Sequence, residues 1–262
     1  MMYRCEATSV EGFIQQLAVG YVARGYLFYV AGSIPEGKEP QDTDERIIKK
    51  YGIDVSKFTR CRENKEGIAP IQYLRFNRFF LILAKHGEHR FFCEERGLRN
   101  IRVHPVRFAG YSVGSRKGRD GKWHASVRIE RTEFKILKQC FLRMSLTAST
   151  EILTVRFAGL GFAPYAPVRD QHRILLRAVN KKRKAAGLEM ISDAVLPKGR
   201  RIVRPFQKLT VSKNDGRVES SFLPGKIGDL KPSNLQNLPG REDFESVSPE
   251  KKKRLQDEPI AP

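Results

Sequence analysis

The sequence lacks any long hydrophobic run. Its longest, Phe79 to Ala84, is far shorter than the ~20 apolar residues that a membrane-spanning helix needs. No apolar stretch follows Arg4 near the start of the chain, so we expect no secretory signal. These absences predict an intracellular protein, cytoplasmic or nucleoid-associated, without a membrane partner.

Cysteine is scarce, and several catalytic motifs are missing. Cys5, Cys61, Cys93 and Cys140 are widely spaced and form no Cys-x-x-Cys pair, so we expect reduced structural thiols. The sequence contains no Gly-rich phosphate loop, no His-Glu-x-x-His and no Gly-x-Ser-x-Gly. Their absence weighs against nucleotide-dependent enzymes and the hydrolases that use these motifs.

Positive charge is abundant. The chain of 262 residues has 49 Lys and Arg against 29 Asp and Glu, a net charge of +20. Self-repulsion at this charge destabilises the compact state, which indicates a partner that neutralises it. Nucleic acid, an anionic membrane surface and an acidic protein are the candidates. The membrane is ranked low because the cationic helix over 168–186 has only a modest aliphatic side opposite its cations, without the Trp or Phe of a membrane-surface helix.

Hydrophobic periodicity predicts an α+β domain over residues 1–147. Helices are expected over 9–25 and 42–52 and after Thr132, and strands over 26–31, 71–84, 106–113 and 123–130, with a loop over 58–67. Helices and strands that alternate in this way predict a ferredoxin-like antiparallel sheet with helices on one face.

The rest of the chain has a different composition. Residues 148–190 are expected to form a helical segment, in which 152–158 is ambiguous and 168–186 is a clear cationic helix ended by Gly187. Residues 191–262 form a basic tail that is rich in Pro, Gly, Ser and charge from about 222. We expect most of this tail to be disordered because it has too few apolar residues to offset the entropy of ordering.

Two concentrations of cations are candidate nucleic-acid contacts. The first is the predicted hairpin 106–130, whose loop 115–122 carries an Asp-Gly turn signal. The second is one stripe of the helix 168–186, where cations repeat every three or four residues. Such a row destabilises an isolated helix unless an anion neutralises it. The predicted phosphate contacts are Arg116, Lys117, Arg119, Lys122, Arg128, Arg169, Arg173, Arg177, Lys181 and Lys184.

A third candidate surface mixes aromatic and basic residues. Tyr73, Arg75 and Arg78 lie close together in the strand predicted over 71–84. On an exposed sheet face they would form a platform on which single-stranded bases stack. The alternative is that they pack in the core.

One arrangement resembles the HUH-type single-strand nucleases. His124 lies on a predicted strand, and Tyr165 precedes the cationic helix. The resemblance implies a divalent metal at His124 and a tyrosine nucleophile at Tyr165. The chain departs from the pattern because Ser126 stands where a second histidine would be, and serine binds divalent metals poorly.

Two weaker patterns could bind a metal. His86, His89 and Cys93 are close in sequence and could bind zinc with a fourth ligand such as His104, or simply form a polar turn. Asp120 and Lys122, with Glu94 and Glu95 upstream, match a loose nuclease pattern. That pattern belongs on a strand, whereas Asp120-Gly121 is typical of a turn.

The sequence thus predicts a nucleic-acid-binding protein that contacts phosphates, with DNA favoured over RNA, serving the replication or mobility of a genetic element. A metal-dependent nuclease or strand transferase using His124 and Tyr165 is the first alternative. An RNA-binding ribonucleoprotein component is the second, and an adaptor for an acidic protein is the third. No cofactor is expected beyond a divalent metal in the nuclease case, and the oligomeric state is not predicted.

Overall fold

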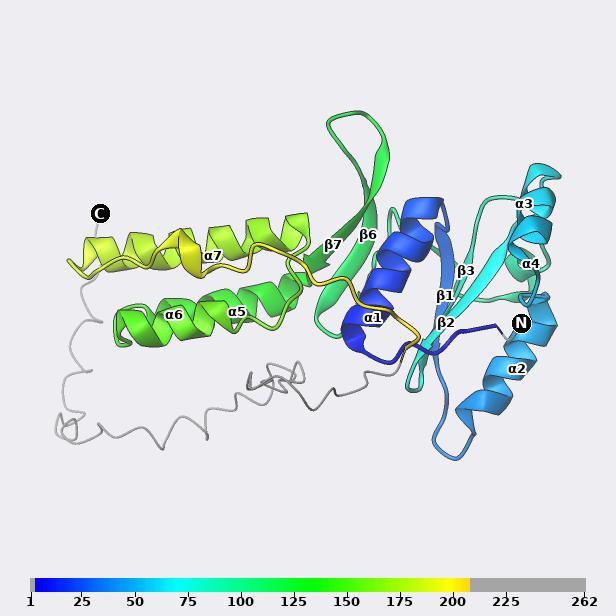
Figure 1. Cartoon of the computed structure of the whole chain (residues 1–262), viewed down its shortest axis with the longest axis horizontal. Helices are drawn as coiled ribbons and strands as arrows, with labels where there is room; N and C mark the ends of the chain where they lie inside the picture. Colours follow the sequence, from blue (N-terminus) through cyan, green and yellow to red (C-terminus); the bar gives the residue numbers. More distant parts are fainter. Residues whose placement is uncertain (1–2, 208–262) are drawn as a thin grey trace, which may run out of the picture. The chain divides into compact units, whose positions relative to one another are not determined.

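The computed structural model describes residues 3–207, which form two antiparallel sheets and several helices (Figure 1). The first sheet has the strand order β2-β3-β1-β4, and the second has the order β5-β6-β7. The strands are β1 (Phe28–Ser33), β2 (Ile71–Phe76), β3 (Phe79–Ala84), β4 (Arg99–Asn100), β5 (Val106–Phe108), β6 (Tyr111–Lys117) and β7 (Trp123–Ile129). The α+β class is therefore as predicted, but the strands form two sheets and not one.

The helices predicted over 9–25 and 42–52, after Thr132 and over 168–186 lie close to those positions, and the structure adds others. They are α1 (Val10–Gln15), continued by η1 (Gln16–Tyr21) and η2 (Val22–Arg24), then α2 (Pro40–Tyr51), α3 (Lys57–Lys65), α4 (Phe91–Glu94), α5 (Arg131–Met144), α6 (Thr150–Ala158), α7 (Ala166–Ala185) and η3 (Asp193–Val195). Ser9 caps α1, and Gly25 ends the segment with a φ of 89°. Within residues 3–207, no helix is long and apolar enough to cross a membrane.

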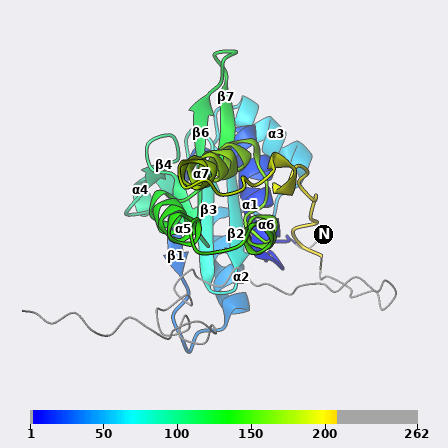
Figure 2. The same ribbon diagram turned by 90° about the vertical axis from the view of Figure 1, so that its left-hand side faces the viewer.

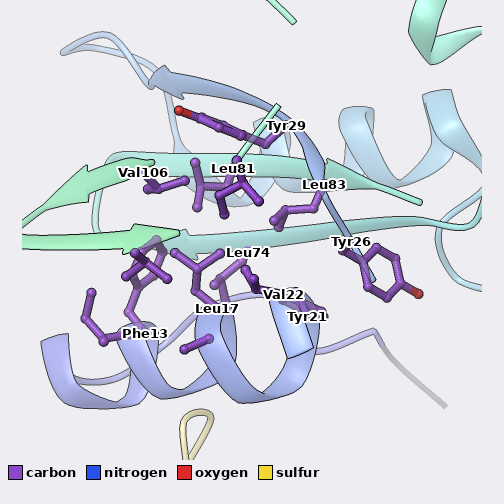
Figure 3. Close-up of a cluster of buried hydrophobic side chains, with 14 of the residues drawn as sticks. Phe13, Leu17, Tyr21, Val22, Tyr26, Tyr29, Leu74, Leu81, Leu83 and Val106 are labelled. Atoms are coloured by element: carbon purple, nitrogen blue, oxygen red, sulfur yellow. The ribbon is translucent and has the colours of Figure 1, made fainter. Parts of the chain in front are cut away.

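Both faces of the first sheet are covered, which corrects the prediction of helices on one face. Side chains alternate along β3, so Leu81 and Leu83 join one hydrophobic cluster with α1 (Figure 3). Ile82 joins another cluster with Ile47 of α2. The reason is that every residue of β3 is apolar, so both faces of the strand are hydrophobic. A strand that is apolar on both faces needs a covering layer on each.

The core under α1 joins the two sheets. Phe13 and Leu17 lie in the same cluster as Leu74 of the first sheet and as Val113 and Val127 of the second. Burial of these side chains is the main favourable contribution to folding, at about 1.5–3 kcal/mol each. This shared core fixes the second sheet against α1 and its continuation, and leaves the opposite face of the sheet available for other contacts.

The long strands expected over 71–84 and 106–113 are each interrupted by a tight turn. Asn77, with a φ of 52°, turns the chain between β2 and β3, and Phe76 pairs with Phe79 across the turn. Ala109 and Gly110, with φ values of 46° and 77°, do the same between β5 and β6. Neither Asn-Arg nor Ala-Gly is a strong hairpin signal in sequence, and the apolar residues on both sides hide the break.

At two helices that lack clear amphipathic periodicity, the structure corrects one prediction and resolves one ambiguous segment. The expected loop 58–67 is α3, whose N-cap Ser56 accepts a hydrogen bond from the backbone N–H of Thr59 at 3.0 Å. No residue of α3 is buried, so there was no apolar stripe to detect. The ambiguous segment 152–158 belongs to α6, capped by Ser149.

The helices α5, α6 and α7 pack around their own hydrophobic cluster, which includes Phe141, Phe157 and Leu176 (Figures 1 and 2). Gln171 of α7 ties this group to β7 through two hydrogen bonds with the backbone of Ile129, at 2.8 and 3.1 Å. These bonds fix the start of α7 beside the second sheet.

The start of the predicted tail, over residues 191–207, is ordered and contacts the N-terminal part of the chain. The carbonyl of Pro205 accepts a hydrogen bond from the N–H of Thr8 at 2.9 Å. Arg200 donates to the side-chain oxygen of Gln15 at 2.7 Å. Backbone hydrogen bonds to distant residues hold this segment despite its polar composition. The rest of the predicted tail, 208–262, lies outside the described residues.

Candidate nucleic-acid interface

The second sheet has one buried face and one polar, basic face. Val113 and Val127 pair across β6 and β7 and point into the core. The register then places Ser112 opposite Arg128, Gly114 opposite Ser126 and Arg116 opposite His124 on the other face, because successive side chains alternate. Small residues in the middle of this face leave room between its cations.

This face forms the floor of a cleft of about 480 Å³. The cleft lies between the β6–β7 hairpin and the turn that precedes β5, which supplies Arg102 and Val103. Its charged lining residues are Arg102, Arg116, Lys117 and Arg128, and no described carboxylate lines it. The cleft is therefore built to accept a negative charge.

Among the cations of the cleft, Arg128 has the environment that most favours a bound anion. Its Nε is buried without a hydrogen-bond partner among the described residues. Burial, and then the charge of Arg116, lowers the pKa of the Arg128 guanidinium. A buried donor without a partner costs about 1–3 kcal/mol. An anion in the cleft would supply an acceptor and relieve the repulsion between the two arginines.

Trp123 gives the cleft an aromatic surface. It is the one tryptophan of the chain and is 45% exposed. The guanidinium of Arg102 lies over its ring at 4.2 Å from the ring centroid. An exposed indole beside arginines is a surface on which a nucleobase can stack.

A second cavity, of about 490 Å³, adjoins the first. Both are lined by Val103 and Pro105, so the turn that carries these residues separates them. The second adds Arg99, which is at the end of the first sheet, and Arg107. We call the two cavities together the basic cleft, with the cations Arg99, Arg102, Arg107, Arg116, Lys117 and Arg128.

The tip of the β6–β7 hairpin projects from the second sheet (Figure 1), and its cations are exposed. Arg119 and Lys122 lie in the turn between β6 and β7. His124 Nε2 lies 3.0 and 2.9 Å from the two carboxylate oxygens of Asp120. This hydrogen bond is the main cause that lowers the pKa of Asp120. The pair stiffens the tip and holds the imidazole in one orientation.

The predicted stripe on α7 is partly free. Arg177, Lys181 and Lys184 are exposed and form no ion pair within residues 3–207. Arg173 pairs with Asp170 at 3.0 Å, and Arg169 donates to the carbonyl of Pro164 at 3.1 Å. Gln171 bonds the backbone of Ile129, which follows Arg128, so the start of α7 lies beside the basic cleft.

The predicted stacking platform around Tyr73 is wrong. Tyr73 is fully buried and Arg75 is 2% exposed. Asp44 of α2 accepts hydrogen bonds from the Tyr73 hydroxyl at 2.7 Å and from Arg75 Nε at 2.9 Å. Arg78 is half-buried and donates to backbone carbonyls, including that of Lys38 at 3.3 Å. The sequence could not reveal this because Asp44 lies about 30 positions earlier.

The metal patterns do not assemble. Within residues 3–207, no three His, Cys, Asp or Glu side chains are grouped so that they could hold a metal ion. His89 Nδ1 accepts a hydrogen bond from the N–H of Phe91 at 3.1 Å, and the His86 ring lies against Phe28. The zinc alternative at His86, His89 and Cys93 is therefore not supported, which leaves the polar turn. Asp120 and Lys122 lie in a turn, whereas the nuclease pattern would require a strand.

His124 and Tyr165 have different surroundings. The Tyr165 ring lies against the guanidinium of Arg200, whose carbon is 4.7 Å from the ring centroid. Burial raises the pKa of the Tyr165 hydroxyl, which makes it a weaker nucleophile at neutral pH. No hydrogen bond in the described part of the chain joins it to His124, which is bound to Asp120.

Comparison of the chain with protein families, with curated proteins and with solved structures gives no match. Function must therefore be argued from the chemistry of the site. Sequence analysis found the hairpin cations and the helical stripe. It missed Arg99, Arg102, Arg107 and Trp123 as site residues. The one available signal was the density of Arg and Lys between residues 96 and 128.

Proposed function

We propose that this protein binds a strand of nucleic acid in the basic cleft. Backbone phosphates would lie against the six cations, and one base would stack on Trp123. The observation that carries the proposal is a basic cleft without a described carboxylate, in which Arg128 Nε has no acceptor and an exposed indole lies beside Arg102. This combination of cations with an aromatic surface is typical of single-strand binding.

The size of the cleft favours a single strand over a duplex. Each of the two cavities is below 500 Å³, which suits one nucleotide or two and is within the ordinary range of ligand sites. The hairpin tip and the α7 stripe would add phosphate contacts on either side. We place DNA before RNA as the ligand, and the replication or mobility of a genetic element as the setting.

We also infer that the first sheet is a ferredoxin-like arrangement. Its order is β2-β3-β1-β4 with antiparallel neighbours, and helices connect β1 to β2 and β3 to β4. This is the succession β-α-β-β-α-β of that arrangement, with a last strand of two residues. A fold of this kind hosts many functions, so it adds nothing to the choice of ligand.

The binding test uses fluorescein-labelled single-stranded DNA, duplex DNA and RNA of one sequence, with anisotropy as the measure of affinity. Quenching of Trp123 would report that the ligand occupies the basic cleft. We expect Arg116→Gln to weaken binding about tenfold at low salt, because it removes a charge-assisted phosphate contact. Arg143→Gln is the matched control, since it removes an exposed cation of α5 far from the cleft lining.

Each outcome of this test is informative. Binding with Trp123 quenching, weakened only by Arg116→Gln, supports the proposal. A preference for RNA would favour the ribonucleoprotein alternative. Binding that is equally weak for all three ligands and insensitive to salt would refute nucleic-acid binding and favour an acidic protein partner.

The nuclease alternative has one specific observation in its favour, the orientation of His124 by Asp120. A carboxylate that orients an imidazole is a common feature of general bases. Mg²⁺ or Mn²⁺ in the binding reactions would make nicking visible on a gel. Nicking that is lost in both His124→Ala and Tyr165→Phe would establish catalysis, whereas intact strands with either metal would exclude this nuclease mechanism.

A further inference from the structure

A separate cavity opens beside the first half of α7. It has a volume of about 360 Å³ and shares no lining residue with the basic cleft. One wall is α7, and the other is the segment that follows Ile191. Asn180 fixes that segment to α7 through two hydrogen bonds with the backbone of Ile191, at 2.8 and 2.9 Å. The cavity is therefore held by defined contacts on both sides.

His172 lies at the base of this cavity and is the most unusual polar residue of the structure. It is fully buried, and neither ring nitrogen has a hydrogen-bond partner among the described residues. Burial lowers its pKa to about 4, so the ring is neutral at pH 7 and carries one N–H donor. Leucine would fill this space without the cost of an unsatisfied polar group. A bound ligand that accepts a hydrogen bond would explain why histidine is present instead.

The charged groups around the cavity favour a doubly charged anion. Arg169, Arg173 and Lys198 line it, against one carboxylate, Asp193. Arg169 and Arg173 each use part of their guanidinium for a contact with Pro164 or Asp170, and each guanidinium has five N–H donors. Leu196 and Pro197 add an apolar wall on which a sugar or base can rest. The volume suits a ligand of about nucleotide size.

We propose that this cavity binds a phosphomonoester, whose charge the three cations neutralise, and that a rotation of the His172 ring, whose nitrogens are closed off in the free protein, brings an N–H to one phosphate oxygen. The phosphomonoester can be a free mononucleotide or the 5′-phosphate at the end of a strand. An internal phosphodiester carries a single charge, whereas a terminal phosphate carries close to two at neutral pH. The site would therefore recognise a group different from those in the basic cleft, and it does not depend on the function proposed for that cleft.

The test uses the full chain and two sets of probes. Inorganic phosphate and adenosine 5′-monophosphate are titrated by calorimetry. A short single-stranded oligonucleotide is then compared with and without its 5′-phosphate. We expect at least one phosphomonoester to bind about tenfold more weakly to Lys198→Ala and to His172→Leu than to the unchanged protein. Preference for the mononucleotide identifies a free nucleotide as the source, and a gain from the 5′-phosphate identifies a strand end.

His172→Leu also answers the objection that a variant has merely failed to fold. It is expected to raise the thermal midpoint while it removes phosphomonoester binding, because an unsatisfied buried group is replaced by an apolar one. Arg143→Gln again serves as the matched loss of one exposed cation. Absence of binding by every phosphomonoester, or equal binding by both variants and the unchanged protein, would overturn the proposal. Failure of the basic cleft would show separately, in the binding of the hydroxyl-ended oligonucleotide and in Trp123 fluorescence.

Discussion

Burial and partners decide what each charged residue of this protein can do. Arg75 and Arg128 both lie on strands whose sequences mix polar and apolar residues. Arg75 meets Asp44, with which it forms an ion pair at 2.9 Å in the core. Arg128 feels the charge of Arg116, and its Nε has no hydrogen-bond partner within residues 3–207. The first arginine is therefore structural, and the second is available to a ligand.

Asp44→Asn is predicted to destabilise the protein by about 1.5–3 kcal/mol, since it weakens a charge-assisted hydrogen bond in the core and leaves Glu6, at 3.1 Å, as the one charged partner of Arg75 within the described residues. Asp44 also accepts hydrogen bonds from Tyr73 and from the Cys5 thiol, and these would be weakened as well. Unfolding in urea measures the change. Asp42→Asn, at an exposed position of the same helix, should change stability by no more than about 0.5 kcal/mol. Equal effects of the two variants would show that the buried pair adds nothing.

His172 makes stability depend on pH on the acid side. Its folded pKa is about 4 and its ordinary value is 6.5, so the unfolded chain takes up the proton first as pH falls. The stability from a neutral His172 is thus complete above pH 6.5 and is lost between about 6.5 and 4. At about 1.4 kcal/mol per pH unit, the loss approaches 3 kcal/mol.

Urea unfolding is measured at several pH values for the unchanged protein and for His172→Leu. The difference between the two isolates the effect of His172 on stability, because the carboxylates titrate in both. The groups that face His172 across its cavity are Arg169, Arg173, Asp193 and Lys198, and all are retained in the variant. The difference in unfolding free energy between the two proteins should shift by about 3 kcal/mol from pH 7 to pH 4. A constant difference would mean that His172 titrates normally in the fold.

At the scale of elements, the turn at Asn77 decides whether residues 71–84 form one strand or two. Its φ of 52° is a left-handed conformation that asparagine tolerates and β-branched residues do not. Asn77→Val should therefore destabilise the protein by about 1–2 kcal/mol, whereas Asn77→Gly should be nearly neutral. Thermal unfolding of both variants checks the ordering. If valine were as stable as glycine, the turn would have to take another conformation.

Periodicity predicted the longer elements that bury a regular apolar face and missed short or weakly amphipathic ones. The cationic helix 168–186 was predictable because Leu175 and Val179 repeat along its buried side. The helix α3 buries nothing and left no pattern. The β2–β3 turn was hidden because Phe76 and Phe79 on either side of it continue the apolar run.

The functional site was predictable to a similar extent. The cations of the hairpin tip and of α7 are visible because they are close in sequence or helically spaced. The basic cleft is not, because it depends on contacts between distant segments. Arg102 lies over Trp123 across a gap of about 20 positions, and only the folded chain places them together. The same holds for His172 and Lys198, which line one cavity from two different segments.

The stripe on α7 allows binding and stability to be separated. Lys181 and Lys184 are exposed, and each lies within one helical turn of another cation. The double variant Lys181→Gln/Lys184→Gln should gain a few tenths of a kcal/mol in stability by relief of repulsion. It should bind single-stranded nucleic acid more weakly if the stripe contacts phosphates. Urea unfolding and anisotropy measure the two effects, and a gain in stability with unchanged affinity would remove the stripe from the proposed interface.

At the scale of the whole molecule, the net charge of +20 raises the question of whether binding is diffuse or localised. A diffuse positive surface attracts any polyanion, and every cation contributes about equally. A localised site concentrates the phosphate contacts, so a few cations carry most of the affinity. In both cases log K falls linearly with log salt, by about 0.7 for each neutralised phosphate on a single strand.

Two double variants of equal charge decide between these cases. Arg116→Gln/Lys117→Gln removes two cations of the basic cleft, and Lys135→Gln/Arg143→Gln removes two exposed cations of α5. Each lowers the net charge from +20 to +18, because two positive charges are lost. The cleft variant should reduce the salt slope by about 1.4, two contacts at about 0.7 each, while the α5 variant leaves the slope almost unchanged. Anisotropy titrations at several salt concentrations give both slopes. Equal slopes would mean that the strand contacts the surface diffusely, and the basic cleft would then have no special role.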